Sequence, residues 1–299
     1  MKHRVGSSAG LVLALISCLG PAPGCGTKPK GPGQMTVAAS FYPMYLAAAN
    51  IASGVPGVQV VNLTRPATGC LHDYQLSTEE LKNLSQASIF VVNGAGMESF
   101  IQKAAAQLPG LKIIEASAGI PLIKGDGETG DNPHVWVSVS GAMQQVNNIA
   151  AGLMKYDPAH APQYRANADE YLARLDSLSS KMNRELKPAA GRDIITFHQA
   201  FSYFAQEFGL RVAAVIEREP GSEPSAAELA RTIKLVRQKK IKALFAEPQY
   251  PAKAAQAIAA ETGTQVYILD PVVTGPMDDP DYYITTMEKN LSVLKTALQ

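Results

Sequence analysis

Apolar and polar residues alternate along the chain with two different periods, one typical of buried strands and one typical of amphipathic helices. Short apolar runs predict strands at 36–40, 58–63, 88–93, 112–116, 193–197, 211–216, 242–246 and 265–269. Helical spacing predicts helices at about 44–53, from 77 onward, and at 141–155, 200–208, 225–238, 251–262 and 283–298. Ser77 with Glu80 and Ser225 with Glu228 are expected to cap two of these helices, and 133–137 is expected to be extended because the residue before a proline avoids the helical region. Strands that alternate with helices indicate parallel sheets with helices on both faces.

One stretch, 157–188, has a helical apolar stripe much longer than the others. Its apolar positions recur every three or four residues, at Tyr164, Ala168, Tyr171, Leu175, Leu178, Met182 and Leu186. Asp157 is expected to cap the helix, Pro158 or Pro162 suits its first turn, and Pro188 is expected to end it. A helix of about 26–30 residues spans ~39–45 Å. The fold class predicted is therefore α/β, with two lobes, each a parallel sheet flanked by helices, joined by one long rigid helix.

The beginning of the chain differs in composition from the rest. Lys2 and Arg4 precede an apolar run, 9–17, that is too short to span a membrane and is typical of a secretory signal. Cys18 follows small residues in the pattern of a bacterial lipoprotein cleavage box, with Cys25 as the alternative lipid anchor. A plain secretory signal with incidental cysteines is the competing interpretation. The predicted location is the periplasm or the outer face of the cytoplasmic membrane, reached by export and held by lipid.

These patterns divide the chain into five predicted segments. They are a signal peptide at 1–17, a flexible tether at 18–35, an N-terminal lobe at 36–156, the long helix at 157–188, and a C-terminal lobe at 189–299.

Charge and cysteine content exclude some classes of function. Four of the 27 basic residues precede residue 35, so the remaining 23 face 26 acidic residues and the body is mildly acidic. This charge argues against nucleic acid as a partner. Cys70 is the one cysteine after the leader, which argues against a disulfide scaffold.

Three of the five histidines follow predicted strands: His72, His134 and His198. Asp270 follows the strand at 265–269 in the same way. Taken singly, each has a structural explanation, because such residues often form turns or core hydrogen bonds. Ligands of parallel sheets bind beyond the carboxyl ends of strands, however, so the four side chains would converge if the lobes face each other.

Three imidazoles and one carboxylate suit zinc. Four protein ligands leave no open coordination position, so such a site holds an ion and does not activate water. His160, at the start of the long helix, is expected to be solvent-exposed.

Six stretches together resemble the zinc/manganese-type solute-binding proteins of ABC importers. They are GCLHDYQLS, DNPHVWVS, ITFHQAFSYFAQEFGL, EPSAAELARTIKLV, ALFAEPQYPAKAAQAIAAETG and VYILDP, and they cover nearly all of 35–298. The resemblance implies two lobes joined by one long helix and a metal bound by His72, His134, His198 and Asp270. It also implies a cognate ABC permease in the cytoplasmic membrane as partner, contact with the membrane through the N-terminal lipid only, and a monomer.

The chain departs from this family at several positions. The sequence 71–76 is LHDYQL where the family usually has Pro-His-Xaa-Tyr-Glu-Pro, and Asn132 replaces an aspartate, which removes a charge beside His134. The polar loop 125–132 contains no histidine. Cys70, two residues before His72, is a soft additional candidate ligand.

The predicted function is a receptor that binds a divalent metal ion and delivers it to a permease for uptake. Ligand softness favours zinc, with manganese and ferrous iron as alternatives. The affinity is expected to fall as histidines protonate, through a pH of about 6.5 and below. The predicted mechanism has loop and small domain shifts and no wide hinge closure, because the long helix limits how far the lobes can swing.

Three other functions are less well supported by the sequence. An enzyme is not predicted, because His-Glu-Xaa-Xaa-His is absent and Glu247 is the one well-placed carboxylate left over. A metal-binding surface adhesin lacks support from repeats or a stalk-like tract. A receptor for an organic chelate would need an aromatic-lined cleft, and the chain has one tryptophan.

Overall fold

The computed structural model describes residues 1, 34–65, 70–71, 74–98, 107–125, 130–216 and 223–299. Cys18, Cys25 and His72 lie outside the described residues, as do nearly all of the predicted signal peptide and tether. Gln34–Gln299 forms one compact unit. Within the described ranges, none of the helices has both the length and the apolar character that crossing a membrane requires.

The N-terminal lobe contains a four-stranded parallel sheet with the order β2-β1-β3-β4. Its strands are β1 (Met35–Ala39), β2 (Val58–Asn62), β3 (Ile89–Val92) and β4 (Lys112–Glu115). The helices described in this lobe are α1 (Tyr42–Ile51), α2 (Thr78–Ser85) and α4 (Val139–Tyr156). Ser77 and Glu80 form the capping box expected at the start of α2.

The C-terminal lobe repeats this topology in the order β6-β5-β7-β8, again with parallel strands. Its strands are β5 (Asp193–Thr196), β6 (Arg211–Val215), β7 (Ala243–Ala246) and β8 (Gln265–Ile268). Its helices are α6 (Ser202–Glu207), α7 (Ala226–Lys239), α8 (Lys253–Thr262) and α9 (Tyr282–Ala297). In both sheets the chain changes winding direction between the two central strands, which is where ligands of such folds bind.

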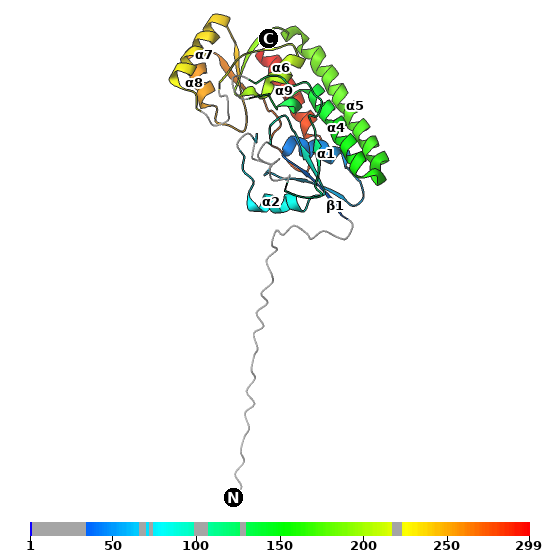
Figure 1. Cartoon of the computed structure of the whole chain (residues 1–299). Helices are drawn as coiled ribbons and strands as arrows, with labels where there is room; N and C mark the ends of the chain where they lie inside the picture. Colours follow the sequence, from blue (N-terminus) through cyan, green and yellow to red (C-terminus); the bar gives the residue numbers. More distant parts are fainter. Residues whose placement is uncertain (2–33, 66–69, 72–73, 99–106, 126–129, 217–222) are drawn as a thin grey trace. The chain divides into compact units, whose positions relative to one another are not determined.

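The long helix α5 (Ala161–Leu186, 26 residues) buries the seven apolar positions of the predicted stripe. It lies alongside α4 and also packs on α9, so it contacts elements that precede and follow it in the chain (Figure 1). The main core includes the apolar stripe of α5 and buried residues of both sheets. The prediction of two α/β lobes linked by one long helix is confirmed.

The helix starts beside Pro162, one of the two prolines expected in its first turn, but the expected cap by Asp157 is wrong. A 3-10 turn, Pro158–His160, precedes α5, and Asp157 accepts hydrogen bonds from the Tyr164 hydroxyl (2.8 Å) and His160 Nδ1 (2.7 Å). The Asp157 carboxylate thus accepts hydrogen bonds from two side chains and does not cap the backbone N–H groups of the helix. His160 is partly buried by this contact.

The extended conformation expected for 133–137 is also wrong, because Val135–Val137 forms a 3-10 turn, η1. Proline fixes its own φ and restricts the residue before it, but it does not extend the residues that follow. Ser138 accepts from the Gly141 N–H (3.0 Å) and caps α4. A Cβ at Gly141 would lie 2.3 Å from the Val135 carbonyl oxygen, so glycine is needed for the turn to pack this closely on the helix.

Candidate metal centre

His198 lies two residues after the central strand β5 and is fully buried. Its Nδ1 is 2.5 Å from Oε1 of Glu247, which follows the other central strand, β7. A carboxylate accepts, so His198 Nδ1 is the donor and Nε2 is directed away from Glu247. The topology of the sheet thus sets the orientation of the imidazole ring.

His134 lies at the start of η1 and is 1% exposed. Oδ1 of Asn132 accepts from the backbone N–H of His134 (3.0 Å) and from its Nδ1 (2.9 Å). Asn132 Nδ2 donates to the Gln199 carbonyl (2.9 Å), which establishes which amide atom faces the histidine. Asn132 therefore orients His134 as an aspartate would, but without a negative charge.

The two histidines meet at the junction of the lobes. Their Nε2 atoms are 3.2 Å apart, and Cys70 Sγ is 3.7 Å from each of them. Each of the three residues offers one ligand atom, and these atoms all lie within 4.8 Å of one another. The structure thus brings together His134 and His198, and it adds Cys70 to them.

The other two predicted ligands are not part of this cluster as described. His72 lies outside the described residues. Asp270 follows β8 at the same sheet edge, where its Oδ1 accepts from the Val272 N–H (2.8 Å) and Gln249 Nε2 (3.2 Å). Burial raises the pKa of Asp270 above its usual value, although these donors oppose the shift. Metal binding by the four predicted residues stays a prediction.

The electrostatics of the cluster favour a cation. Burial disfavours the charged form of His198, but the Glu247 carboxylate and Cys70 outweigh it and raise the pKa of His198 to about 10. Without a metal, His198 is therefore protonated at neutral pH, and its Nε2 donates toward His134. Oε2 of Glu247 is buried and has no hydrogen-bond partner among the residues that the structure describes.

A second buried carboxylate, Glu98, supports the cluster from the N-terminal lobe. It accepts from the Ser40 hydroxyl (2.7 Å), the Asn93 N–H (2.7 Å) and the Gly94 N–H (3.0 Å). Asn93 in turn donates to the Pro133 carbonyl (2.9 Å), next to His134. Burial raises the pKa of Glu98 to about 7, against the effect of these donors. Sequence analysis missed Glu98, whose signal is a lone acid in the loop that follows a central strand.

Trp136 connects the lobes beside the histidines. Its Nε1 donates to the Pro271 carbonyl (2.8 Å), and its own carbonyl accepts from the Tyr283 hydroxyl (2.8 Å). The ring of His134 lies 5.3 Å from that of Trp136, measured between centroids. This contact holds the His134 turn against the chain that follows β8.

Three side chains of α1 hold the segment between β8 and α9 in the same way. Each donates a hydrogen bond to a backbone carbonyl of that segment. The pairs are the Tyr42 hydroxyl to Pro276 (2.6 Å), the Tyr45 hydroxyl to Met277 (2.7 Å) and Asn50 Nδ2 to Pro280 (2.9 Å). With Trp136, these bonds link the N-terminal lobe to a segment of the C-terminal lobe at four positions. Such cross-links limit the range over which the lobes can separate.

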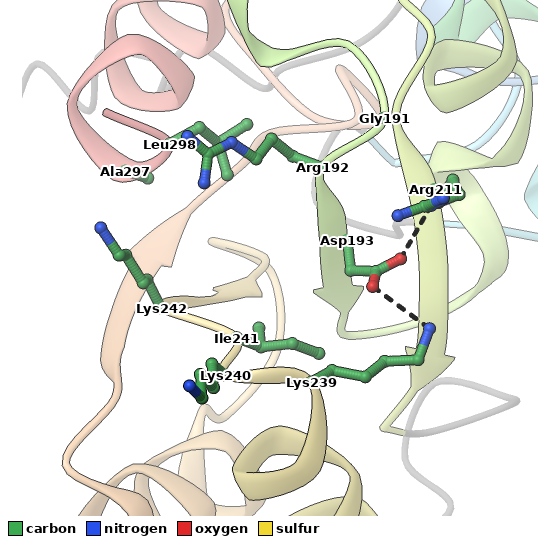
Figure 2. Close-up of a pocket in the computed structure, with 10 residues that line it drawn as sticks. All are labelled: Gly191, Arg192, Asp193, Arg211, Lys239, Lys240, Ile241, Lys242, Ala297 and Leu298. Carbon is green, nitrogen blue, oxygen red and sulfur yellow. Dashed lines mark hydrogen bonds and ion pairs between the residues drawn. The ribbon is translucent and has the colours of Figure 1, made fainter.

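A different pocket lies at the opposite, amino end of the C-terminal sheet (Figure 2). Its volume is about 220 Å³, and its cationic residues are Arg192, Arg211, Lys239, Lys240 and Lys242. The Asp193 carboxylate accepts from Arg211 Nε (3.0 Å) and Lys239 Nζ (3.2 Å), as Figure 2 shows. This concentration of positive charge repels divalent cations, so the histidine cluster is the better metal site.

Two parallel-sheet lobes, a long connecting helix and buried imidazoles at the junction define the class of two-lobed metal receptors. The chain belongs to the family described as "Zinc-uptake complex component A periplasmic", which matches residues 37–297. The resemblance seen in the sequence is thereby confirmed.

Individual relatives agree with this assignment. The chain is 30% identical to the high-affinity zinc uptake system protein ZnuA of Bacillus subtilis (strain 168), over 95% of this chain and 94% of that protein. It is 28% identical to the zinc-binding lipoprotein AdcA of Streptococcus pneumoniae (strain ATCC BAA-255 / R6), over 91% of this chain but only 57% of AdcA. The solved structure of the solute-binding protein FpvC from Pseudomonas aeruginosa in complex with Mn²⁺ is similar with a TM-score of 0.80, at 32% identity, over 89% of this chain and 98% of that one.

Proposed function

We propose that the protein is an extracytoplasmic receptor that binds one zinc ion between its lobes and delivers it to the permease of an ABC importer. The observation that carries this proposal is the convergence of His134 and His198, both buried, with their Nε2 atoms 3.2 Å apart. Each ring is oriented by an acceptor on Nδ1, an arrangement typical of metal-binding histidines. His72 and Asp270 are the further ligands proposed from the sequence.

Zinc is the proposed cargo, with manganese and ferrous iron as the alternatives. Imidazole nitrogens suit zinc, and zinc also binds more tightly than manganese to most nitrogen sites. The names of the Bacillus and Streptococcus relatives refer to zinc, whereas the FpvC structure was solved with Mn²⁺. The identity of the metal therefore has to be decided by competition between these ions.

The binding step proposed here replaces a proton with a metal ion. His198 gives up its Nε2 proton when the ion enters, and Glu247 remains to balance the added charge. Because hydrogen bonds already join the lobes, binding involves shifts of loops and small domain adjustments. The site holds the ion without chemical change, and the protein is proposed to be a receptor without enzymatic activity.

The location and assembly are proposed from the sequence. Cys18, or alternatively Cys25, carries a lipid that keeps the receptor at the membrane, and the AdcA relative is named a lipoprotein. The receptor acts as a monomer in the periplasm or at the outer face of the cytoplasmic membrane, where it meets its permease.

Metal content measured by mass spectrometry tests this function. The full chain with Cys18→Ser and Cys25→Ser, which removes the acceptors for lipid, is stripped of metal and dialysed against equal zinc and manganese. We expect one zinc ion per chain, and loss of that ion in the additional variant His198→Ala.

His160→Ala is the matched control for this test. Like His198, His160 is hydrogen-bonded to a carboxylate, but it lies at the start of α5, outside the histidine cluster. The His160→Ala variant should therefore retain the zinc. Bound manganese in place of zinc, or no bound metal in the chain that keeps His198, would contradict the proposal.

A further inference from the structure

We propose that the Cys70 thiolate is itself a ligand of the transported ion and takes the anionic position predicted for Asp270, so that the receptor has a mixed sulfur–nitrogen site. This inference rests on the proposed function and deepens it, because it names the chemical class of the cargo. It concerns a residue that the resemblance to metal receptors does not assign as a ligand.

The distances among the three side chains match those of a tetrahedral zinc ion. With Zn–N bonds of about 2.0–2.1 Å and a Zn–S bond of about 2.3 Å, two nitrogens lie about 3.3–3.4 Å apart and each lies about 3.6 Å from the sulfur. The corresponding distances here are 3.2 Å between the Nε2 atoms and 3.7 Å from Sγ to each Nε2. All three edges of the triangle thus agree with one shared ion to within about 0.2 Å.

The orientation of the three groups agrees with the same ion. Glu247 and Asn132 occupy the Nδ1 atoms of the two histidines, so the Nε2 atoms are the ones that face Cys70. Zinc ligands need this outer support, because an acceptor on the far nitrogen holds the ring and makes it more basic.

Cys70 is also positioned by the opposite lobe. Burial raises the pKa of Tyr250, and the backbone of Cys70 beside its hydroxyl opposes this rise. The ring of Tyr250 stacks on Phe197 (5.6 Å between centroids, 8° between planes) and lies edge-on to His198 (6.1 Å, 82°). Tyr250 therefore lies against both Cys70 and His198, the two residues that would share the ion.

A thiolate changes which metals the site accepts. Sulfur ligands suit zinc and softer ions, whereas manganese prefers carboxylate, carbonyl and water oxygens. The Cys70 thiolate and the Glu247 carboxylate together carry two negative charges, which balance a divalent ion in this buried setting. The cargo is therefore a borderline or soft divalent ion, with zinc first and manganese disfavoured.

X-ray absorption at the zinc edge tests the ligand directly. The chain is prepared with Cys18→Ser and Cys25→Ser, so that Cys70 is the one cysteine left, and is loaded with one zinc ion. The expected spectrum contains one sulfur at about 2.3 Å and nitrogen or oxygen neighbours at about 2.0–2.1 Å. The sulfur shell should disappear in Cys70→Ser.

Affinity measurements with two metals give a second readout. Cys70→Ser is expected to weaken zinc binding about tenfold or more and to change manganese binding less than about threefold, because only zinc gains strongly from sulfur. Cys70→Asp, which restores an anionic ligand of the harder class, should raise manganese affinity above that of Cys70→Ser. Equal metal-free circular dichroism and melting curves for the three chains exclude a folding defect as the cause.

The outcomes separate the two proposals. If the reference chain binds one zinc ion with only nitrogen and oxygen neighbours, and Cys70→Ser binds it equally well, the cysteine ligand is refuted while the receptor function stands. If the reference chain binds no metal, the receptor function itself fails. A sulfur shell that is lost together with zinc selectivity in Cys70→Ser establishes the mixed site.

Discussion

The two ends of the C-terminal sheet each pair a carboxylate with nitrogen bases, yet the two pairs differ in nearly every physical respect. At the carboxyl end, His198 and Glu247 have side chains that are 1% and 0% exposed and lie 2.5 Å apart. At the amino end, Asp193 is 16% exposed and its partners Arg211 and Lys239 are 67% and 44% exposed. The first pair keeps one carboxylate oxygen without a hydrogen-bond partner among the described residues, whereas the second joins one acid to two cations.

This difference shows that an ion pair shifts the pKa of its members strongly only where it is buried. In the exposed pair, water screens the charges, so the pair adds little to stability and little selectivity. In the buried pair, each charge acts strongly on its neighbour, which is why the pKa of His198 is raised to about 10. A divalent ion that takes the proton's place at the buried pair meets the same strong field.

The largest effect we expect comes from pH. Because the pKa of His198 is raised to about 10 without metal, the ion must displace a proton throughout the range below that value. Displacing one proton changes the apparent affinity tenfold per pH unit, so the zinc affinity should rise about 100-fold between pH 6 and pH 8. Calorimetry in buffers of different ionisation enthalpy measures both the affinity and the proton release.

A histidine with its ordinary pKa would give a different curve. Affinity would then level off above about pH 6.5, so a plateau between pH 7 and pH 8 would contradict the raised pKa. In the metal-free protein, the same shift contributes stability that is fully present below about pH 6.5 and is lost as the pH rises through about 10. Stability of the empty site and affinity for zinc should therefore move in opposite directions with pH.

An intermediate effect is expected from Glu247→Gln. The amide can still accept from His198 Nδ1, but it removes the charge that raises the pKa of His198. We expect zinc affinity at pH 8 to fall about tenfold, at the lower end of the usual range for such supporting residues. The affinity should also level off closer to neutral pH. If calorimetry gives an unchanged dependence of zinc affinity on pH, the charge of Glu247 is not the cause of the raised pKa of His198.

The smallest effect is expected from Asp193→Asn at the opposite end of the sheet. It weakens the ion pairs to Arg211 and Lys239, each worth ~0.2–1 kcal/mol when exposed, so the free energy of unfolding should fall by about 1 kcal/mol or less. Urea unfolding measures this loss. Zinc affinity should be the same as in the unmodified chain, and a large change in it would mean that the two ends of the sheet are coupled.

The fold was predictable because its main signals are local and repeated. The stripe on α5 identified all seven residues that the helix buries, and the capping boxes at Ser77 and Ser225 placed the starts of α2 and α7. The errors occurred where a contact outside the local pattern decides the outcome. Asp157 is hydrogen-bonded to Tyr164 and His160, and the turn after Pro133 packs on Gly141. Helix and strand propensities of the sequence predict neither contact.

The candidate site was predictable only in part. The rule that ligands gather beyond strand ends placed His134 and His198 in one region, and the structure has them 3.2 Å apart. The proximity of Cys70 to these two histidines could not be predicted, because its spacing from His72 says nothing about its distance from residues far away in the chain. The identities of the supporting groups, Glu247 on His198 and Asn132 on His134, likewise follow from packing between segments.

The hydrogen bonds from α1 to the segment that follows β8 have a consequence for the order of folding. Tyr42, Tyr45 and Asn50 belong to the first helix, but their carbonyl partners are provided near the end of the chain. The helix α9, which follows that segment, then packs against α5 and α1. The N-terminal half thus cannot complete its own contacts until nearly the whole polypeptide has been synthesised. A chain that is made from its N-terminus therefore stays incompletely folded until late, which is the state in which a protein can still be threaded across a membrane.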